Sequence, residues 1–201
     1  RRPVVLLAGV APEVERAIKA AGYQVRSVAF TPFDEAAAAK VSHFETYNRT
    51  PASQRVADIV TALRAQPHAV LVAAGDAALA GALATAITPP RLAVLDAGGF
   101  DTSRDDDFLA RLYVPGLRRA GDLRTASEMA PGRLIVHNAG AAFDAPWSKG
   151  IYFGGETIAA ETTWLGTVYI TGDLTFSSTT LTVQPGTQVL RERGRVQVRG
   201  A

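Results

Sequence analysis

Few side chains in this sequence could carry acid–base or nucleophilic chemistry. There is no cysteine, and the three histidines are His43, His68 and His137. His137 ends an apolar run, 134–136, where a buried strand is expected, and so it is predicted at the carboxyl edge of a sheet, where ligand sites of α/β proteins gather. His68 is expected to be solvated in a loop. His137 is the best single candidate for a site, with a hydrogen-bonded structural role as the alternative to catalysis.

The carboxylates are more numerous, and three positions fit a partner for that histidine: Asp96, Asp101 and Asp144. Asp76 directly follows the apolar run at 69–73 and opens an alanine-rich helix. An N-cap is the natural role for an aspartate in that position. The alternative is a displaced carboxylate nucleophile. The weak catalytic candidates are therefore Asp76, His137 and Asp144.

Two further motifs could bind a ligand, and neither has the required spacing. Residues 75–81 join a strand to a helix but lack the G-x-G-x-x-G and Gly-Lys-Ser/Thr patterns of nucleotide loops. The three aspartates at 105–107 lack the regular spacing of a calcium loop, and at a helix start they are favourable partners of the helix dipole. We therefore expect no cofactor and no metal.

The elements that must position these residues alternate between strands and helices over residues 1–147. Apolar runs at 4–8, 24–30, 69–73, 92–95 and 134–136 predict strands. Helices are predicted from Pro12 to Gly22, after a Thr50 N-cap, from about 76 to 87, and around 108–112. This alternation predicts an α/β domain whose parallel sheet is covered by helices on both faces.

Residues 148–201 have a different pattern and predict a second, all-β unit. Short alternating segments at 168–170, 174–176, 181–183 and 196–198 are separated by Gly-Asp, Pro-Gly and Arg-Gly turns. The boundary falls near Pro146, and no helix is expected from Gly150 onward.

The segment from Thr46 to Phe143 resembles bacterial α/β-hydrolases of the acetyl-xylan-esterase and dienelactone-hydrolase type, through phrases at 47–50, 70–81, 114–121 and 135–140. The resemblance implies an esterase scaffold with a G-x-S-x-G turn after the strand at 69–73. The matching residues are Ala-Ala-Gly-Asp-Ala, so the nucleophile position falls on Gly75. The domain is thus expected to keep the scaffold without the serine.

The segment from about Thr163 to Arg199 resembles the opening turns of right-handed parallel β-helices in exported bacterial proteins. About one and a half turns fit, and such a solenoid usually needs roughly three or more repeats to bury its core. The last strand, Arg195, Val196, Gln197, Val198 and Arg199, is therefore an expected assembly edge. The tail could fold back on the α/β domain, continue in a longer solenoid, or stack on another subunit. Arg191, Arg193, Arg195 and Arg199 could protect that edge by charge.

Composition limits the partners. With 47% hydrophobic and 20% charged residues the chain is an ordinary globular protein. A net charge of +2 reflects a slight arginine excess without a basic stripe, so no nucleic acid is expected. No apolar run is long enough for a membrane span. The chain begins inside a strand without methionine, as in a mature or partial product.

We expect a non-catalytic, exported structural protein at the bacterial surface, forming a homo-oligomer or fibre through the β tail. One alternative is an ester hydrolase acting on acylated carbohydrate. Another is a carbohydrate-binding module that uses Trp147, Tyr152 and Trp164, although core or turn packing is the alternative role for these aromatic residues.

Overall fold

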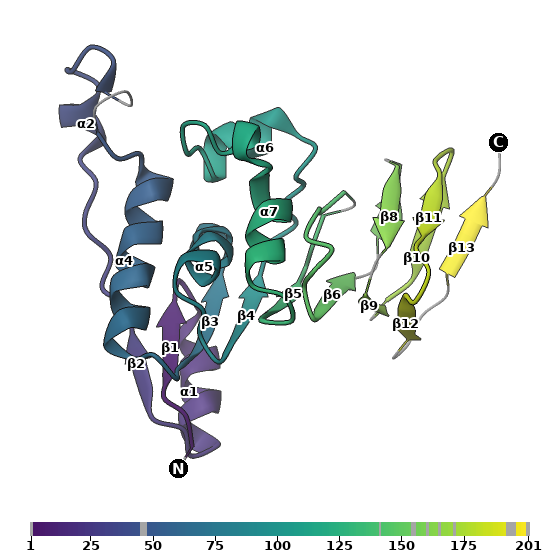
Figure 1. Cartoon of the computed structure of the whole chain (residues 1–201), viewed down its shortest axis with the longest axis horizontal. Helices are drawn as coiled ribbons and strands as arrows, with labels where there is room; N and C mark the ends of the chain where they lie inside the picture. The colour runs from purple at the N-terminus through teal and green to yellow at the C-terminus, as the bar shows by residue number, and fades with distance from the viewer. Residues whose placement is uncertain are drawn as a thin grey trace.

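The computed structural model describes residues 2–44, 48–140, 142–153, 156–159, 161–164, 166–170, 172–191 and 196–199, and it places the α/β part and the β tail side by side (Figure 1). The first part alternates strands with helices: β1 (Val5–Ala8), α1 (Pro12–Ala20), β2 (Val25–Ser27), α2 (Glu35–Ala38), α4 (Pro51–Ala65), β3 (Val70–Ala74), α5 (Asp76–Ile87), β4 (Leu92–Asp96), α6 (Asp105–Arg111), the 3-10 helix η1 (Arg118–Ala120), α7 (Asp122–Met129) and β5 (Leu134–His137). Among its described residues the second part has strands alone: β6 (Gly150–Phe153), β7 (Glu156–Ile158), β8 (Thr162–Trp164), β9 (Thr167–Ile170), β10 (Leu174–Ser177), β11 (Leu181–Val183), β12 (Gln188–Arg191) and β13 (Val196–Arg199).

One parallel sheet of eight strands runs through both parts of the chain. Its order is β12-β9-β6-β5-β4-β3-β1-β2, and each neighbouring pair is parallel. The first five strands have the order 2-1-3-4-5, a common doubly wound arrangement. A parallel α/β sheet followed by a strand-rich tail was predicted, and both are confirmed.

Helices α4, α5 and α7 pack on the face of the sheet that carries Leu71, Ala73 and Leu95. A Cβ added to Gly81 of α5 would lie 3.2 Å from the side chains of both Leu71 and Leu95. The small residues of α5 are therefore required by its close approach to the strands, and residues 77–85 of this helix are buried. The sequence predicted an alanine-rich helix at this position.

The opposite face of the sheet is only partly covered. Val70, Val72, Val94 and Ile135 point to that side and are half-buried. Helix α1 lines a cavity of about 570 Å³ against the β1 and β3 side of this face, and none of its own residues is buried. The connection from β5 to β6 contains no described helix, and its Phe143 packs edge-on against Phe100 instead.

The β tail winds through three sheets in a fixed order. After β6, β9 and β12 in the large sheet, β7, β10 and β13 form a second sheet, and β8 and β11 form a third. Side chains in matching register point inward: Ile151 lies beside Val168, and Phe153 beside Ile170. These inward residues are in line with Val136 of β5, so the core of the α/β part continues into the tail.

Several local predictions can be checked against these elements. Thr50 is the N-cap of α4, accepting a 3.2 Å hydrogen bond from the amide of Ser53, as predicted. The expected strand at 24–30 is shorter, covering Val25–Ser27. The four predicted tail strands are confirmed as β9, β10, β11 and β13, whereas β6, β7, β8 and β12 were missed because they lack clear apolar alternation. None of the described helices is both long and apolar enough to cross a bilayer.

Candidate functional site

The turn between β3 and α5 is the first candidate site. Gly75 has φ 59° and ψ −134°, a conformation that side-chain-bearing residues rarely adopt. A Cβ built on Gly75 would meet no atom within 4 Å. The turn therefore leaves open space beside Gly75, and Gly75 itself offers no reactive group.

Asp76 is the first residue of α5, and Gly75 occupies the N-cap position, so the predicted N-cap role of Asp76 is wrong by one residue. The Asp76 carboxylate instead accepts a 3.0 Å hydrogen bond from Nε of Arg111, on α6. The guanidinium of Arg55, on α4, lies 3.8 Å from the other oxygen of the Asp76 carboxylate. Both carboxylate oxygens thus face cations, which does not favour Asp76 as a nucleophile.

Arg111 also holds the loop after β4. Its guanidinium donates hydrogen bonds to the carbonyl oxygens of Ala97 at 3.1 Å and Gly98 at 3.2 Å, and it lies 5.5 Å from the centre of the Phe100 ring. The Gly98 residue has φ 56°, and an added Cβ would lie 3.2 Å from the same guanidinium. Arg111 therefore joins the β3–α5 turn, the β4 loop and α6 into one unit.

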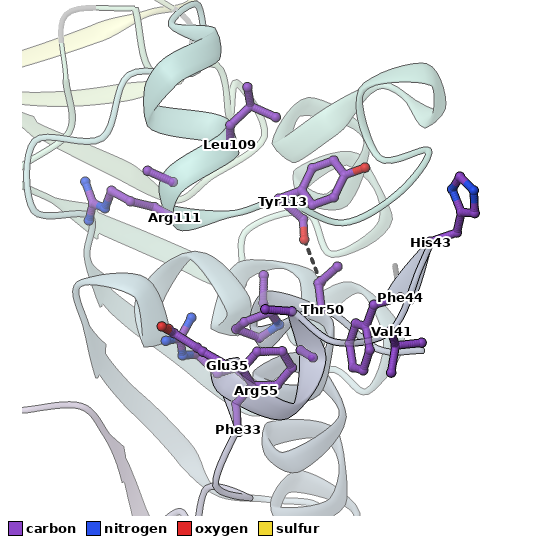
Figure 2. Close-up of a pocket in the computed structure, with 15 residues that line it drawn as sticks. Phe33, Glu35, Val41, His43, Phe44, Thr50, Arg55, Leu109, Arg111 and Tyr113 are labelled. Atoms are coloured by element: carbon purple, nitrogen blue, oxygen red, sulfur yellow. Dashed lines mark hydrogen bonds between the residues drawn. The ribbon is translucent and has the colours of Figure 1, made fainter. Parts of the chain in front are cut away.

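A cavity of about 570 Å³ opens next to this unit (Figure 2). Phe33, Phe44 and Tyr113 contribute aromatic side chains to its lining, and Arg55 and Arg111 contribute cationic ones. Thr50 closes one wall by donating a 2.6 Å hydrogen bond to the carbonyl of Tyr113, drawn as the dashed line in Figure 2. The cavity could admit a small molecule, although its lining mixes both charges with apolar groups and selects no single ligand class.

His137 lies on another part of the carboxyl edge. It pairs in register with Asp96 of β4, and the neighbouring Asn138 donates from Nδ2 to both Asp96 oxygens at 3.0 Å. Asp96 also accepts a 2.9 Å hydrogen bond from the amide of Gly98. Burial lowers the pKa of His137 from its ordinary value, and the negative charge of Asp96 partly opposes that change. This change favours the neutral form of the His137 imidazole.

Asp144 belongs to a third environment. Its carboxylate pairs with Arg124 of α7 at 2.9 Å, and its amide donates to the hydroxyl of Thr102. Successive side chains of β5 point to opposite faces of the sheet, and His137 points away from the face on which α7 packs. The structure therefore gives Asp76, His137 and Asp144 separate partners on different elements. The sequence analysis did not identify the arginines that pair with Asp76 and Asp144, because nothing in their spacing marked them.

The remaining predicted residues also have defined places. Asp105 pairs with Arg118 at 3.1 Å, and Asp107 lies 3.9 Å from Arg104. The described part of the chain contains no group of three or more His, Asp or Glu residues arranged to hold a metal. His68 is exposed in the loop before β3, as predicted. Asp101 accepts from the amide and hydroxyl of Ser103.

The three aromatic residues considered for carbohydrate binding do not form one surface. Trp164 is only 4% exposed and packs between Phe153 and Phe176 in the tail core, so it is unavailable to a ligand. Trp147 is 49% exposed at the start of β6. The side chain of Tyr152 lies outside the described residues. For Trp164, core packing was the alternative interpretation, and it is the one observed.

The expected assembly edge is β13, in which residues 196–199 pair in parallel with β10. Arg195 and Arg193 lie outside the described residues. Arg191 ends β12 and is exposed.

Comparison with known proteins identifies no relative: no family model, curated protein or solved structure matches this chain.

The two arginines around Asp76 should differ in their contribution to stability. Arg111→Met removes three hydrogen bonds, one of them to the carbonyl of the buried residue Ala97, so we expect the free energy of unfolding to fall by about 1–3 kcal/mol. Arg55→Met removes a loose, half-exposed pair and should cost less than about 1 kcal/mol. Urea unfolding measures both, and equal effects would contradict the structural role assigned to Arg111.

The lowered pKa of His137 makes stability depend on pH. Because the unfolded chain binds a proton on this residue more readily than the folded chain, stability should fall as the pH drops below about 6.5, the ordinary histidine value. His137→Gln should reduce the fall in Tm between about pH 7.5 and 5.5. The matched variant His68→Gln changes an exposed histidine and should retain the parent profile; a His137→Gln profile identical to the parent would refute the assignment.

Proposed function

We propose that this chain is a non-catalytic structural module that pairs with a second copy through the last described strands of its β tail. The absence of catalysis is supported by the turn at Gly75, which has the backbone of a strained strand-to-helix elbow but no side chain. Asp76, the nearest carboxylate in sequence, is engaged by arginines. A degenerate α/β-hydrolase origin, with α1 as the helix on the second sheet face, is consistent with this turn.

We interpret the tail as the start of a β-solenoid. Strands β6, β7 and β8 each belong to a different one of the three sheets and form the first row of the tail. Strands β9, β10 and β11 form a second row in the same order, and β12 and β13 begin a third row. Each strand pairs in parallel with its counterpart one row earlier. This is the nearest-neighbour stacking from which solenoids derive their stability. On this interpretation the α/β part caps the first row, since β6 is bonded to β5.

The observation that carries the proposal is the contrast between the two ends of the tail core. In the first row, Ile158 and Trp164 are buried. At the other end, Val183 of β11 shares register with Trp164 and is 50% exposed, and Val189 of β12 shares register with Val168 and is 43% exposed. Apolar side chains that point into the core thus lie open at one end only. A covering partner would remove that apolar surface from water.

A second copy is the occupant that we favour, joined end to end by a two-fold axis. Such an interface uses the same patch on both subunits and closes on itself. A head-to-tail fibre that continued the large sheet would need a free edge on β6, and that edge is already bonded to β5. Arg191 shares register with the inward-facing Ile170, and a charge in such a position opposes unlimited strand addition. A dimer therefore fits better than the fibre also expected from the sequence.

Two adjacent residues of β12 provide a matched test of this interface. Val189 points toward the core and Leu190, 46% exposed, points the other way. We expect the parent chain to sediment as a dimer at micromolar concentration, Val189→Lys to yield monomer, and Leu190→Lys to remain dimeric. Analytical ultracentrifugation measures the oligomeric state of each variant directly. A monomeric parent, or equal effects of the two substitutions, would contradict the proposal.

The non-catalytic part has its own test, which also addresses the alternative of an ester hydrolase. Hydrolysis of a nitrophenyl ester by the purified chain should not exceed that of its Asp76→Ala and His137→Ala variants, because no nucleophile stands at Gly75. Turnover by the parent that both substitutions abolish would establish an esterase and overturn the proposal. Export to the bacterial surface stays a prediction.

A further inference from the structure

A row of basic residues lies along the amino-terminal edge of the large sheet. Arg2 precedes β1, His68 precedes β3, Arg91 precedes β4, Arg133 precedes β5 and Lys149 precedes β6. These strands are neighbours in the order β6-β5-β4-β3-β1, labelled in Figure 1, so the five residues precede adjacent strands along one edge of the sheet. With strands about 4.8 Å apart, the row extends over roughly 20 Å.

The positive charge of the three arginines and the lysine in this row is not neutralised within the described part of the chain. All five side chains belong to exposed residues, and none of them forms an ion pair with a described carboxylate. Arg2 donates to the carbonyl of Ala21 and lies over the Tyr23 ring, and Arg133 donates to the carbonyls of Pro90 and Arg91. These contacts hold the guanidinium groups at the edge without cancelling their charge.

Large apolar side chains are exposed at the same edge. Helices α5 and α7 end there with Ile87, 56% exposed, and Met129, 62% exposed. Trp147 lies beside the start of β5, because its carbonyl accepts a 3.0 Å hydrogen bond from the amide of Gly132. Basic residues that complement helix C-termini would account for charge at this edge. They do not account for an exposed tryptophan, methionine and isoleucine among them.

We propose that this edge binds the surface of an anionic lipid bilayer. Lys and Arg near an anionic membrane gain electrostatic energy from the lipid headgroups, and tryptophan prefers the interface between headgroups and acyl chains. Ile87 and Met129 would enter the same boundary with Trp147, as apolar side chains do in peripheral membrane proteins. A nucleic acid would use the basic row but would leave the aliphatic side chains in water.

Vesicle co-sedimentation of the full chain tests the proposal with phosphatidylglycerol and phosphatidylcholine vesicles. We expect binding to the anionic vesicles alone, weakened by raised salt. The double variant Arg91→Gln, Lys149→Gln should lower the partition coefficient roughly thirtyfold, at about fivefold for each basic residue. The control Arg49→Gln, Arg119→Gln removes two exposed charges elsewhere and should bind like the parent. Circular dichroism verifies that each variant is folded.

Tryptophan fluorescence provides a second readout. The chain has two tryptophans, and Trp164 is buried, so a blue shift on vesicle binding should come from Trp147 and vanish in Trp147→Phe. Equal binding to both kinds of vesicle, no binding to either, or unchanged binding by the Arg91/Lys149 variant would overturn the proposal. Tighter binding to duplex DNA than to anionic vesicles at the same salt would also overturn it, assigning the edge to nucleic acid. None of these outcomes depends on dimer formation through the tail.

Discussion

Strand β6 is the element on which the two halves of this molecule depend. It pairs with β5 on one side and β9 on the other, and Ile151 fills the same inner layer as Val136 and Val168. The hydrogen-bonded pairing of parallel strands continues without a break from the α/β part, which has helices, into the tail. The buried side chains of β6 therefore belong to one continuous core with those of β5 and β9. Removing the α/β part would expose both the β6 edge and the first-row side chains.

The same topology determines which surfaces are left uncovered. The connections from β2 to β5 place α4, α5 and α7 on one face, whereas the β5–β6 connection adds no described helix to the other. The helices end at the edge where the strands begin, and that edge collects basic and apolar side chains. At the opposite edge Arg111 and Asp76 tie α6 to the β3–α5 turn.

The elements with strong local signals could be predicted from the sequence. Thr50 before Pro51 specifies a helix start, and the alanines after Asp76 specify a helix against the sheet. Strands such as β7 could not be predicted, because a strand of three residues carries little pattern and owes its existence to its neighbour β10. The Arg111–Asp76 pair joins residues 35 positions apart, and the basic row spans most of the α/β part. Such contacts follow from strand order, which local patterns do not specify.

The stacked register of the tail also implies a direction for its folding. Each row pairs with the row before it, and β6 pairs with a strand that forms only when the α/β part is assembled. Chain-closure entropy disfavours a later row that forms before the row on which it packs, because that row's contacts are then missing. The α/β part thus acts as a template, and the tail should fold outward from β6 toward β13. A destabilising substitution near β5 would then prevent the whole tail from folding, whereas one near β12 would leave the earlier rows folded.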